Sequence, residues 1–195
     1  IQKNAFFDST LTAVTIPSKV QMIGENAFKK CNNLKTLKFA EPSSLRSIDK
    51  YAFSESPIEE AVIPASVEII HEGAFKQCPQ LKSVEFTEDS ELKSIEKETF
   101  FNSGLEDITI PPKVAKISQF TLKQCNKLKS VKFLDNSLVA EIAKEAFASS
   151  TLLQIIIPSN VINIDEHAFY NCSKLQNVGF ANESKLIHIH KHAFA

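Results

Sequence analysis

Large hydrophobic residues recur along the chain at two alternating intervals. Each unit ends at one anchor residue, and successive anchors are separated by 22 and 25 residues in turn, so that every second anchor is 47 residues away. The nine anchors are Phe6, Phe28, Phe53, Phe75, Phe100, Leu122, Phe147, Phe169 and Phe194. A fixed period of this length is typical of a solenoid, in which each repeat packs only against its neighbours.

Each unit also contains a short segment in which apolar and polar residues alternate. In the segment 105–110, Ile108 and Ile110 alternate with polar residues, which is the period of a half-buried strand. No segment is followed by a two-residue hairpin turn. The sequence therefore predicts one parallel sheet with one short strand in each turn of the solenoid. The eight predicted strands begin at Leu11, Leu34, Ile58, Leu81, Leu105, Leu128, Leu152 and Leu175.

The rest of each unit predicts a return path across the core. Proline ends the predicted strand in alternate units, because it has no N–H to donate to a ladder. A Val-x-x-Ile or Leu-x-x-Ile pair then turns the chain back, as Val20 and Ile23 do. Asp49, Ser118 and Asp165 stand where a helix N-cap would, before the anchor. We therefore expect one- or two-turn helical segments that depend on the stacked core for their stability.

The composition changes this picture little. The chain has 195 residues, 43% of them hydrophobic, and a net charge of −1, which argues against nucleic acid or an anionic membrane as the main partner. No apolar run is long enough to span a bilayer, and no leader precedes Ile1. We expect a single domain over residues 1–195, with about eight turns in four double repeats of 47 residues. Neither end has the polar residues of a capping repeat, so we expect a fragment of a longer array or a chain without its flanks.

The cysteines follow the same period. Cys31, Cys78, Cys125 and Cys172 are each 47 residues apart. In a solenoid they would lie two turns apart, about 9–10 Å, whereas a disulfide requires Cα atoms within about 7 Å. Their spacing does not fit the ligand pairs of a zinc site. The sequence predicts four free, buried thiols in the core and leaves the redox compartment open.

The repeated text Leu-x-x-Val-x-Ile-Pro-x-x-Val-x-x-Ile-x-x-x-Ala-Phe-x-x-Cys, as in residues 11–31, resembles the leucine-rich repeats of the BspA-like family, also called the Treponema pallidum type. The resemblance covers the whole chain. The chain departs from the commonest leucine-rich repeats because no Asn ladder follows the strand. Thr121 and Leu122 interrupt the Ala-Phe motif once.

The resemblance implies an α/β leucine-rich-repeat solenoid of right-handed winding. Its parallel sheet would form the concave face, with short helical or 3-10 turns on the other side. The resemblance also implies a surface-exposed protein of a host-associated bacterium or parasitic protist, used in adhesion and protein binding. We therefore expect a cell-surface or extracellular location, and a protein or glycoprotein as the partner.

Two columns of charge run along the predicted stack. The column at the first exposed strand position reads Thr12, Lys35, Glu59, Lys82, Glu106, Lys129, Leu153 and Gln176. The column three residues before each anchor reads Glu25, Lys50, Glu72, Lys97, Gln119, Lys144, Glu166 and Lys191. Successive turns lie about 4.8 Å apart, so opposite charges would face each other.

These columns have two interpretations. In the first, both columns serve only to stabilise and align the stack. In the second, the strand column and its neighbours form a binding surface, as the concave faces of solenoids do. The residues of this expected binding surface are Lys35, Lys38, Glu59, Glu60, Lys82, Glu85, Glu106, Asp107, Lys129 and Lys132. An apolar contact patch at Val62, Leu153 and Ile156 is a further hypothesis.

Signals for catalysis or cofactor binding are weak. His188, His190 and His192 alternate in a way that a metal site would allow, but they occupy ordinary repeat positions, and we predict no metal. The chain has four glycines and no phosphate loop, nucleophile elbow or zinc-protease motif. Carboxylates recur at equivalent positions, which is typical of a scaffold. We predict no enzyme and no cofactor. Asn182 is a better glycosylation candidate than Asn171, which adjoins Cys172.

Two classes of function therefore remain. The first is a non-enzymatic scaffold that binds a protein partner through its concave face. The second is a structural module that self-associates through its uncapped ends or its charge columns.

Overall fold

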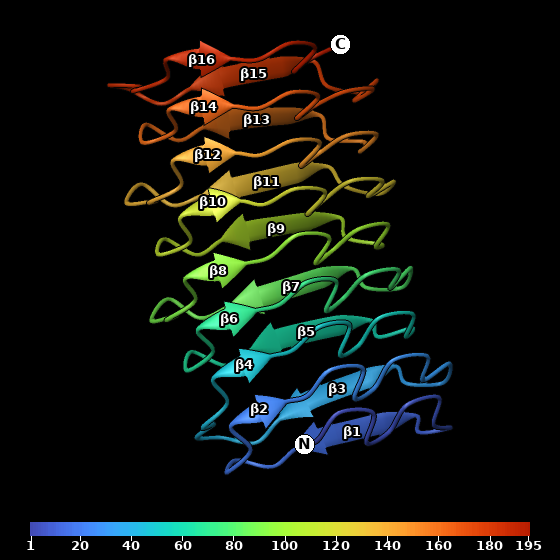
Figure 1. The fold of residues 1–195 in the computed structure, drawn as a ribbon. Coiled ribbons are helices and arrows are strands. Elements are labelled where there is room, and N and C mark those ends of the chain that lie inside the picture. Colours follow the sequence, from blue (N-terminus) through green and yellow to red (C-terminus); the bar gives the residue numbers. More distant parts are fainter.

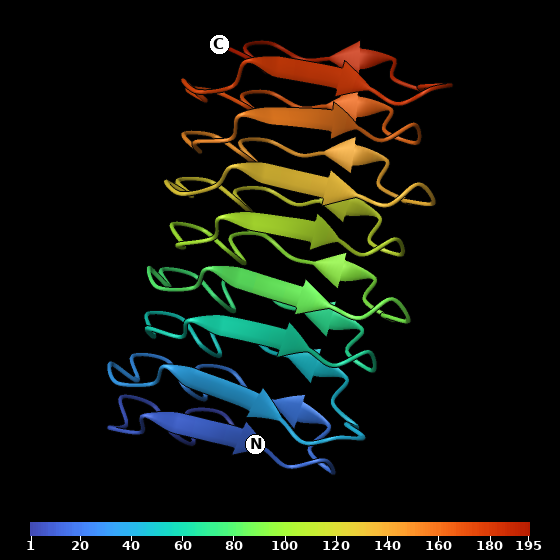
Figure 2. The ribbon, with the colours of Figure 1, turned by 180° about the vertical axis from the view of Figure 1, so that it is seen from behind.

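The computed structural model describes residues 1–195 and shows a parallel β-solenoid of about eight turns (Figure 1). Each turn contains one four-residue strand and one two-residue strand. The chain runs steadily from one end of the stack to the other, and the two termini lie at opposite ends (Figures 1 and 2). No segment is a helix of the length and apolarity that crossing a membrane requires.

The four-residue strands form the predicted parallel sheet. Its order is β1-β3-β5-β7-β9-β11-β13-β15, so neighbours in space are successive turns. The strands are β1 (Ala13–Ile16), β3 (Thr36–Phe39), β5 (Glu60–Ile63), β7 (Ser83–Phe86), β9 (Asp107–Ile110), β11 (Ser130–Phe133), β13 (Gln154–Ile157) and β15 (Asn177–Phe180). Each begins two residues after its predicted start. In alternate repeats the residue at the predicted start still belongs to the tight turn before the strand. For example, the N–H of Leu34 donates to the carbonyl of Cys31.

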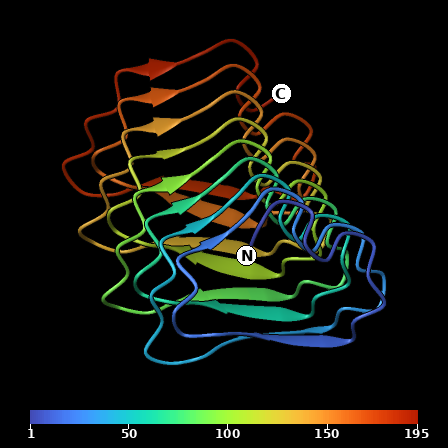
Figure 3. The ribbon, with the colours of Figure 1, turned by 60° about the horizontal axis from the view of Figure 1, so that its bottom comes forward.

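A second set of strands lies across the core from the first, as Figure 3 shows, and the sequence pattern did not predict it. The Val-x-x-Ile return segments end in two-residue strands that pair in parallel. They form two four-stranded sheets, with the break between β8 and β10. The strands are β2 (Met22–Ile23), β4 (Ser47–Ile48), β6 (Ile69–Ile70), β8 (Ser94–Ile95), β10 (Lys116–Ile117), β12 (Glu141–Ile142), β14 (Asn163–Ile164) and β16 (His188–Ile189).

The predicted helical segments around the anchors are wrong. The anchor segments are chains of tight turns, which we call anchor turns, and no helix is present. Two residues in almost every anchor turn have a positive φ, such as Asn26 (54°) and Lys30 (61°) on either side of Phe28. A helix requires a run of residues with right-handed backbone angles, so the two residues with positive φ prevent a helix around each anchor. The N–H of Phe28 instead donates to the carbonyl of Ala52 in the next turn, at 2.7 Å.

The expected N-caps have other partners. The side chain of Asp49 accepts the N–H of Lys50, and Ser118 Oγ donates to the carbonyl of Ile95 at 2.7 Å. Both bonds stabilise turns of the solenoid. The right-handed winding and the concave shape of the sheet face stay predictions of the resemblance.

The core is a set of stacked columns. The Phe anchors form parallel ring stacks, with centroids 5.2 Å apart for Phe28 and Phe53 and 5.3 Å apart for Phe53 and Phe75. Buried Leu122 interrupts this column, because stacked rings run from Phe6 to Phe100 and resume only at Phe147. The stacking of one turn on the next therefore buries rings that a single turn could not shield.

The four cysteines are free, as predicted. Cys31, Cys78 and Cys125 are buried, whereas Cys172 is half-buried. Each thiol donates to the carbonyl of the anchor 25 residues earlier, for example Cys78 to Phe53 at 3.2 Å. Burial raises the pKa of the Cys78 thiol to about 12 and that of Cys125 to about 11, so both stay protonated. The thiols are thus hydrogen-bonded parts of the core.

The thiols belong to a longer column of side chains that the sequence pattern did not predict. Serine takes the same place, three residues after the anchor, in alternate turns. The column reads Ser9, Cys31, Ser56, Cys78, Ser103, Cys125, Ser150 and Cys172. The hydroxyl of Ser56 donates to the carbonyl of Phe28 at 2.8 Å, as the thiols do to their anchors. The thiols and Ser56 of this column thus satisfy backbone carbonyl groups of the anchor residues.

Candidate binding surface

The eight-stranded sheet presents two rows of side chains on its outer face. In each strand the second residue faces the core and the first and third face outward, as in β5, where Glu60 and Val62 are exposed and Ala61 is buried. The alternation of strand side chains produces these rows. The third-position row reads Thr15, Lys38, Val62, Glu85, Thr109, Lys132, Ile156 and Gly179.

The structure brings the ten predicted binding residues together on this face. Lys38, Glu85 and Lys132 occupy the third position of their strands, and Glu60 and Asp107 occupy the first. The other five lie immediately before a strand. Nine of the ten are exposed and Glu106 is half-buried. The five that precede a strand are Lys35, Glu59, Lys82, Glu106 and Lys129.

The predicted charge ladder is almost absent on this face. Only Glu106 and Lys129 form an ion pair, at 2.6 Å. The hydrogen bond and the charge of Lys129 lower the pKa of Glu106, and the same bond raises the pKa of Lys129. Exposed ion pairs gain little, so the remaining side chains stay free in water.

In the second predicted column, beside the anchor turns, more of the charged side chains form ion pairs than on the sheet face. Glu72 lies between Lys50 (3.7 Å) and Lys97 (3.3 Å), and Lys144 pairs with Glu166 at 3.2 Å. The neutral Gln119 interrupts the column. Glu25 pairs with Lys3 instead of Lys50. Ion pairs between successive turns therefore lie mainly on this side of the molecule.

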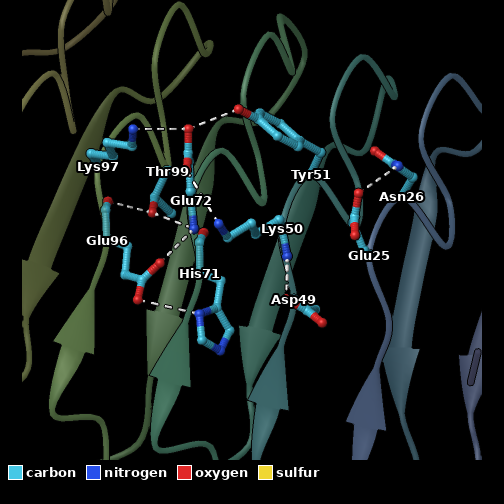
Figure 4. Close-up of polar contacts among 10 residues, drawn as sticks. All are labelled: Glu25, Asn26, Asp49, Lys50, Tyr51, His71, Glu72, Glu96, Lys97 and Thr99. Atoms are coloured by element: carbon cyan, nitrogen blue, oxygen red, sulfur yellow. Dashed lines mark hydrogen bonds and ion pairs between the residues drawn. The ribbon is translucent and has the colours of Figure 1, made fainter. Parts of the chain in front are cut away.

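Glu72 is the centre of a polar cluster, shown in Figure 4. The hydroxyl of Tyr51 donates to Glu72 at 2.8 Å, and the backbone N–H of Glu72 donates to Glu96 at 3.1 Å. Burial alone would raise the pKa of Glu72, but the hydrogen bonds from Tyr51 and Lys97 and the nearby lysine charges together lower it. Burial, followed by the hydrogen bond to Glu72 and its charge, raises the pKa of Tyr51 to about 12.

This cluster has the properties of a structural network. No buried side-chain nitrogen or oxygen in the protein lacks a hydrogen-bond partner. His71 pairs with Glu96, with Nδ1 and Oε1 3.2 Å apart. Glu72 Oε1 accepts from Tyr51 and lies 3.3 Å from Lys97, so the carboxylate is held ionised by side chains of the neighbouring turns. Tyr51 and His71 could not be predicted from the repeat, because neither belongs to the repeated text.

The three alternating histidines do not converge on one point, because they contact different neighbours. The rings of His188 and His190 lie 5.9 Å apart, and His190 Nε2 is 3.8 Å from Asp165 Oδ1. His192 stacks on His167 instead, at 5.4 Å. No group of three or more potential metal ligands is gathered in the structure.

The expected apolar patch is not continuous. Val62 and Ile156 are 53% and 66% exposed, but they lie four turns apart on β5 and β13. Leu153 precedes β13 and is also exposed. Val62 and Ile156 line two separate grooves of the outer face, of about 880 and 950 Å³. The first groove is lined by residues of β3 and β5, and the second by residues of β11 and β13 together with some of β9 and β15.

Comparisons with solved structures support the fold. The pneumococcal vaccine antigen PcpA is 23% identical with a TM-score of 0.56, over 97% of this chain and 59% of that one. A leucine-rich cell surface protein of Faecalibacterium prausnitzii is 20% identical with a TM-score of 0.52, over 93% and 83%. The T. pallidum leucine-rich repeat protein is 22% identical with a TM-score of 0.50, over 92% and 61%. The chain thus spans about three fifths of the length of PcpA and of the T. pallidum protein.

At these identities the solved structures show a shared fold. A search of curated proteins found no significant match. The family model of the BspA type leucine-rich repeat region matches six copies, over residues 1–129 and 93–195, which together cover the whole chain. This match agrees with the repeated text and with the stacked parallel sheet. The chain belongs to the BspA type leucine-rich repeat family.

Proposed function

We propose that this chain is a non-enzymatic scaffold that binds a protein or glycoprotein through the concave outer face of its eight-stranded sheet. One observation carries the proposal. Eight of the ten charged residues predicted for this face take part in no ion pair of the protein, whereas many charges beside the anchor turns are paired with each other. Exposed charges of both signs without internal partners suit the surface of another protein better than a polyanion.

The location on a cell surface is part of the same proposal. The family and the description of the F. prausnitzii protein as a cell surface protein support it. So does the description of PcpA as a vaccine antigen. Asn182 in the loop after β15 is exposed, and we keep it as a glycosylation candidate.

Charge reversal on the sheet face tests the proposal. The double variant Lys82→Glu/Lys129→Glu should weaken binding to purified host extracellular-matrix proteins at least about tenfold, because rim charges steer and orient the partner. The control variant Lys30→Glu/Lys191→Glu makes the same change of net charge at exposed lysines in the anchor turns. Binding is measured by surface plasmon resonance on the immobilised chain. Equal affinities for both double variants would place the binding site elsewhere.

Exposed apolar side chains on the first and last turns favour a second candidate, which is self-association. Phe7 and Ile187 are exposed there, and another copy of the chain would cover them by stacking end to end. Sedimentation velocity at several concentrations separates the two functions. A monomer that binds matrix proteins supports the scaffold, and concentration-dependent association without matrix binding supports the structural role.

A further inference from the structure

The two grooves on the outer face occupy the same place in the repeat. The first is lined by residues such as Lys38 and Val62, and the second by Lys132 and Ile156, each 94 residues later in the chain. This separation is two double repeats, or four turns of the solenoid. The two grooves are therefore copies of one local structure.

Interrupted strand pairing opens both grooves. The register between β3 and β5 contains only Thr36↔Glu60, and that between β11 and β13 contains only Ser130↔Gln154. In contrast, β1 and β3 pair over four residues. The strands at each groove thus separate after their first residue pair. A proline follows the second strand of each groove, and in the first groove it is Pro64.

The two grooves carry the same chemistry. Each has an exposed lysine at the third position of its first strand, Lys38 or Lys132. Each has an exposed branched aliphatic residue at the third position of its second strand. Neither lysine belongs to an ion pair of the protein. An unpaired ammonium group beside an exposed aliphatic side chain complements an apolar residue with an acidic neighbour.

The groove chemistry is not continuous along the sheet. The third strand position is Glu85 on β7, which lies between the grooves, and Thr109 on β9, which lines the second groove. Both residues are polar and provide neither the lysine nor the aliphatic residue. There the register reaches one residue further, to Val84↔Ile108. The first groove also contains two carboxylates, Glu41 and Asp89, and the second contains one, Asp135, which disfavours a polyanion as the partner. The outer face therefore offers two like sites with a different surface between them.

The spacing of the sites indicates the form of the partner. Four turns at about 4.8 Å each separate the grooves by about 19 Å. An extended peptide covers that distance with about six residues, at about 3.3 Å for each residue. One short segment can therefore reach both grooves at once, and the second contact then forms at a high effective concentration.

We infer that the two grooves bind one extended segment of a partner protein, in which two apolar residues, each beside an acidic residue, are spaced by about six residues. The segment crosses the strands along the axis of the solenoid. This inference rests on the proposed function, because both use the outer face of the eight-stranded sheet. It adds the sequence pattern that the partner segment must have to bind there.

Synthetic peptides test the inference with the full chain. The first probe is a fluorescent Gly/Ser peptide with two Asp-Leu pairs about six residues apart. The second carries one pair, and the third carries both pairs only about three residues apart. Fluorescence anisotropy should show the first peptide binding at least about tenfold tighter than the other two, since only it reaches both grooves.

Variants of one groove at a time complete the test. Lys38→Glu and Lys132→Glu should each reduce the affinity for the first peptide to that for the one-pair peptide, while Lys30→Glu should leave it unchanged. Circular dichroism confirms that the variants fold. Absence of binding, equal affinities for the three peptides, or insensitivity to the groove variants would each overturn the inference. A matrix protein whose binding is lost in Lys82→Glu/Lys129→Glu but not in Lys38→Glu or Lys132→Glu would keep the proposed function and reject the two-groove partner.

Discussion

Contacts between side chains of neighbouring turns restrict which residue each position of the repeat can hold. Gly73 has a positive φ of 62° at a position where other turns place asparagine, glutamate, histidine, tyrosine or phenylalanine. A Cβ atom at Gly73 would overlap the ring of Tyr51, which lies against it from the preceding turn. The glycine is therefore required by the tyrosine more than by the backbone angle. Tyr51 in turn donates to Glu72, so three side-chain positions in adjacent turns depend on one another.

This dependence predicts the outcome of a double-mutant cycle. Gly73→Ala should lower the free energy of unfolding by about 1–3 kcal/mol, because the methyl group displaces the Tyr51 ring. In the Tyr51→Ala background the same substitution should cost much less, since the ring is gone. Urea denaturation of the four proteins measures both effects. Additive costs would show that the backbone angle, and not the tyrosine, selects glycine.

The Glu72 carboxylate predicts part of the acid sensitivity. Its pKa is lowered in the folded state, so its contribution to stability is present above the pKa of the unfolded chain and is lost as pH falls through the folded pKa. The wild-type protein should therefore lose more stability than Glu72→Gln when the pH is lowered below about 5. Thermal denaturation across an acid pH series, with Glu88→Gln in an exposed loop as control, measures the difference. Parallel curves for wild type and Glu72→Gln would contradict the assignment.

Secondary-structure elements differ in how well the sequence predicts them. The long strands are predictable because Ile108 and Ile110 alternate with polar residues, as their counterparts do in other turns. The two-residue strands are too short to show any period. The sequence predicts helices in place of the anchor turns because positive φ angles fall on residues such as Lys30 and Glu98, whose types do not indicate a left-handed backbone. Only neighbouring turns, which accept their N–H groups, stabilise that conformation.

The Phe column gives a prediction for one such turn. Leu122→Phe should raise the free energy of unfolding by about 0.5–1.5 kcal/mol, because a ring at this position would stack between Phe100 and Phe147. Leu122→Ala should instead lower it by about 2–5 kcal/mol through the cavity that it leaves. Guanidinium denaturation measures both. A loss of stability in Leu122→Phe would show that the turn around Thr121 is shaped for leucine.

Several interruptions of the repeat coincide near the middle of the molecule. The second sheet divides between β8 and β10, the Phe column is interrupted at Leu122, and the charge column has the neutral Gln119 there. A solenoid is held together turn by turn, so weaker contacts at one interface divide its stability there. The placement of the charged residues on the sheet face was predictable from the repeat. Their lack of ion pairs and the two grooves were not, because both depend on how side chains and strand ends lie in space.

Native-state hydrogen exchange measures this division. Amides in the turns before β9 and those after β11 should exchange as two cooperative groups with different free energies of opening. Leu122→Phe should bring the two values together by strengthening the interface between them. A single group that includes both ends of the chain would contradict the division.

The most direct measurement for the account is lysine footprinting of the complex with a bound matrix protein. Acylation rates of individual lysines are compared by mass spectrometry with and without the partner. The account predicts strong protection of Lys35, Lys38, Lys82 and Lys132 on the sheet face and unchanged labelling of Lys30 and Lys191 in the anchor turns. Protection of Lys30 and Lys191 with free labelling of the sheet lysines would contradict it.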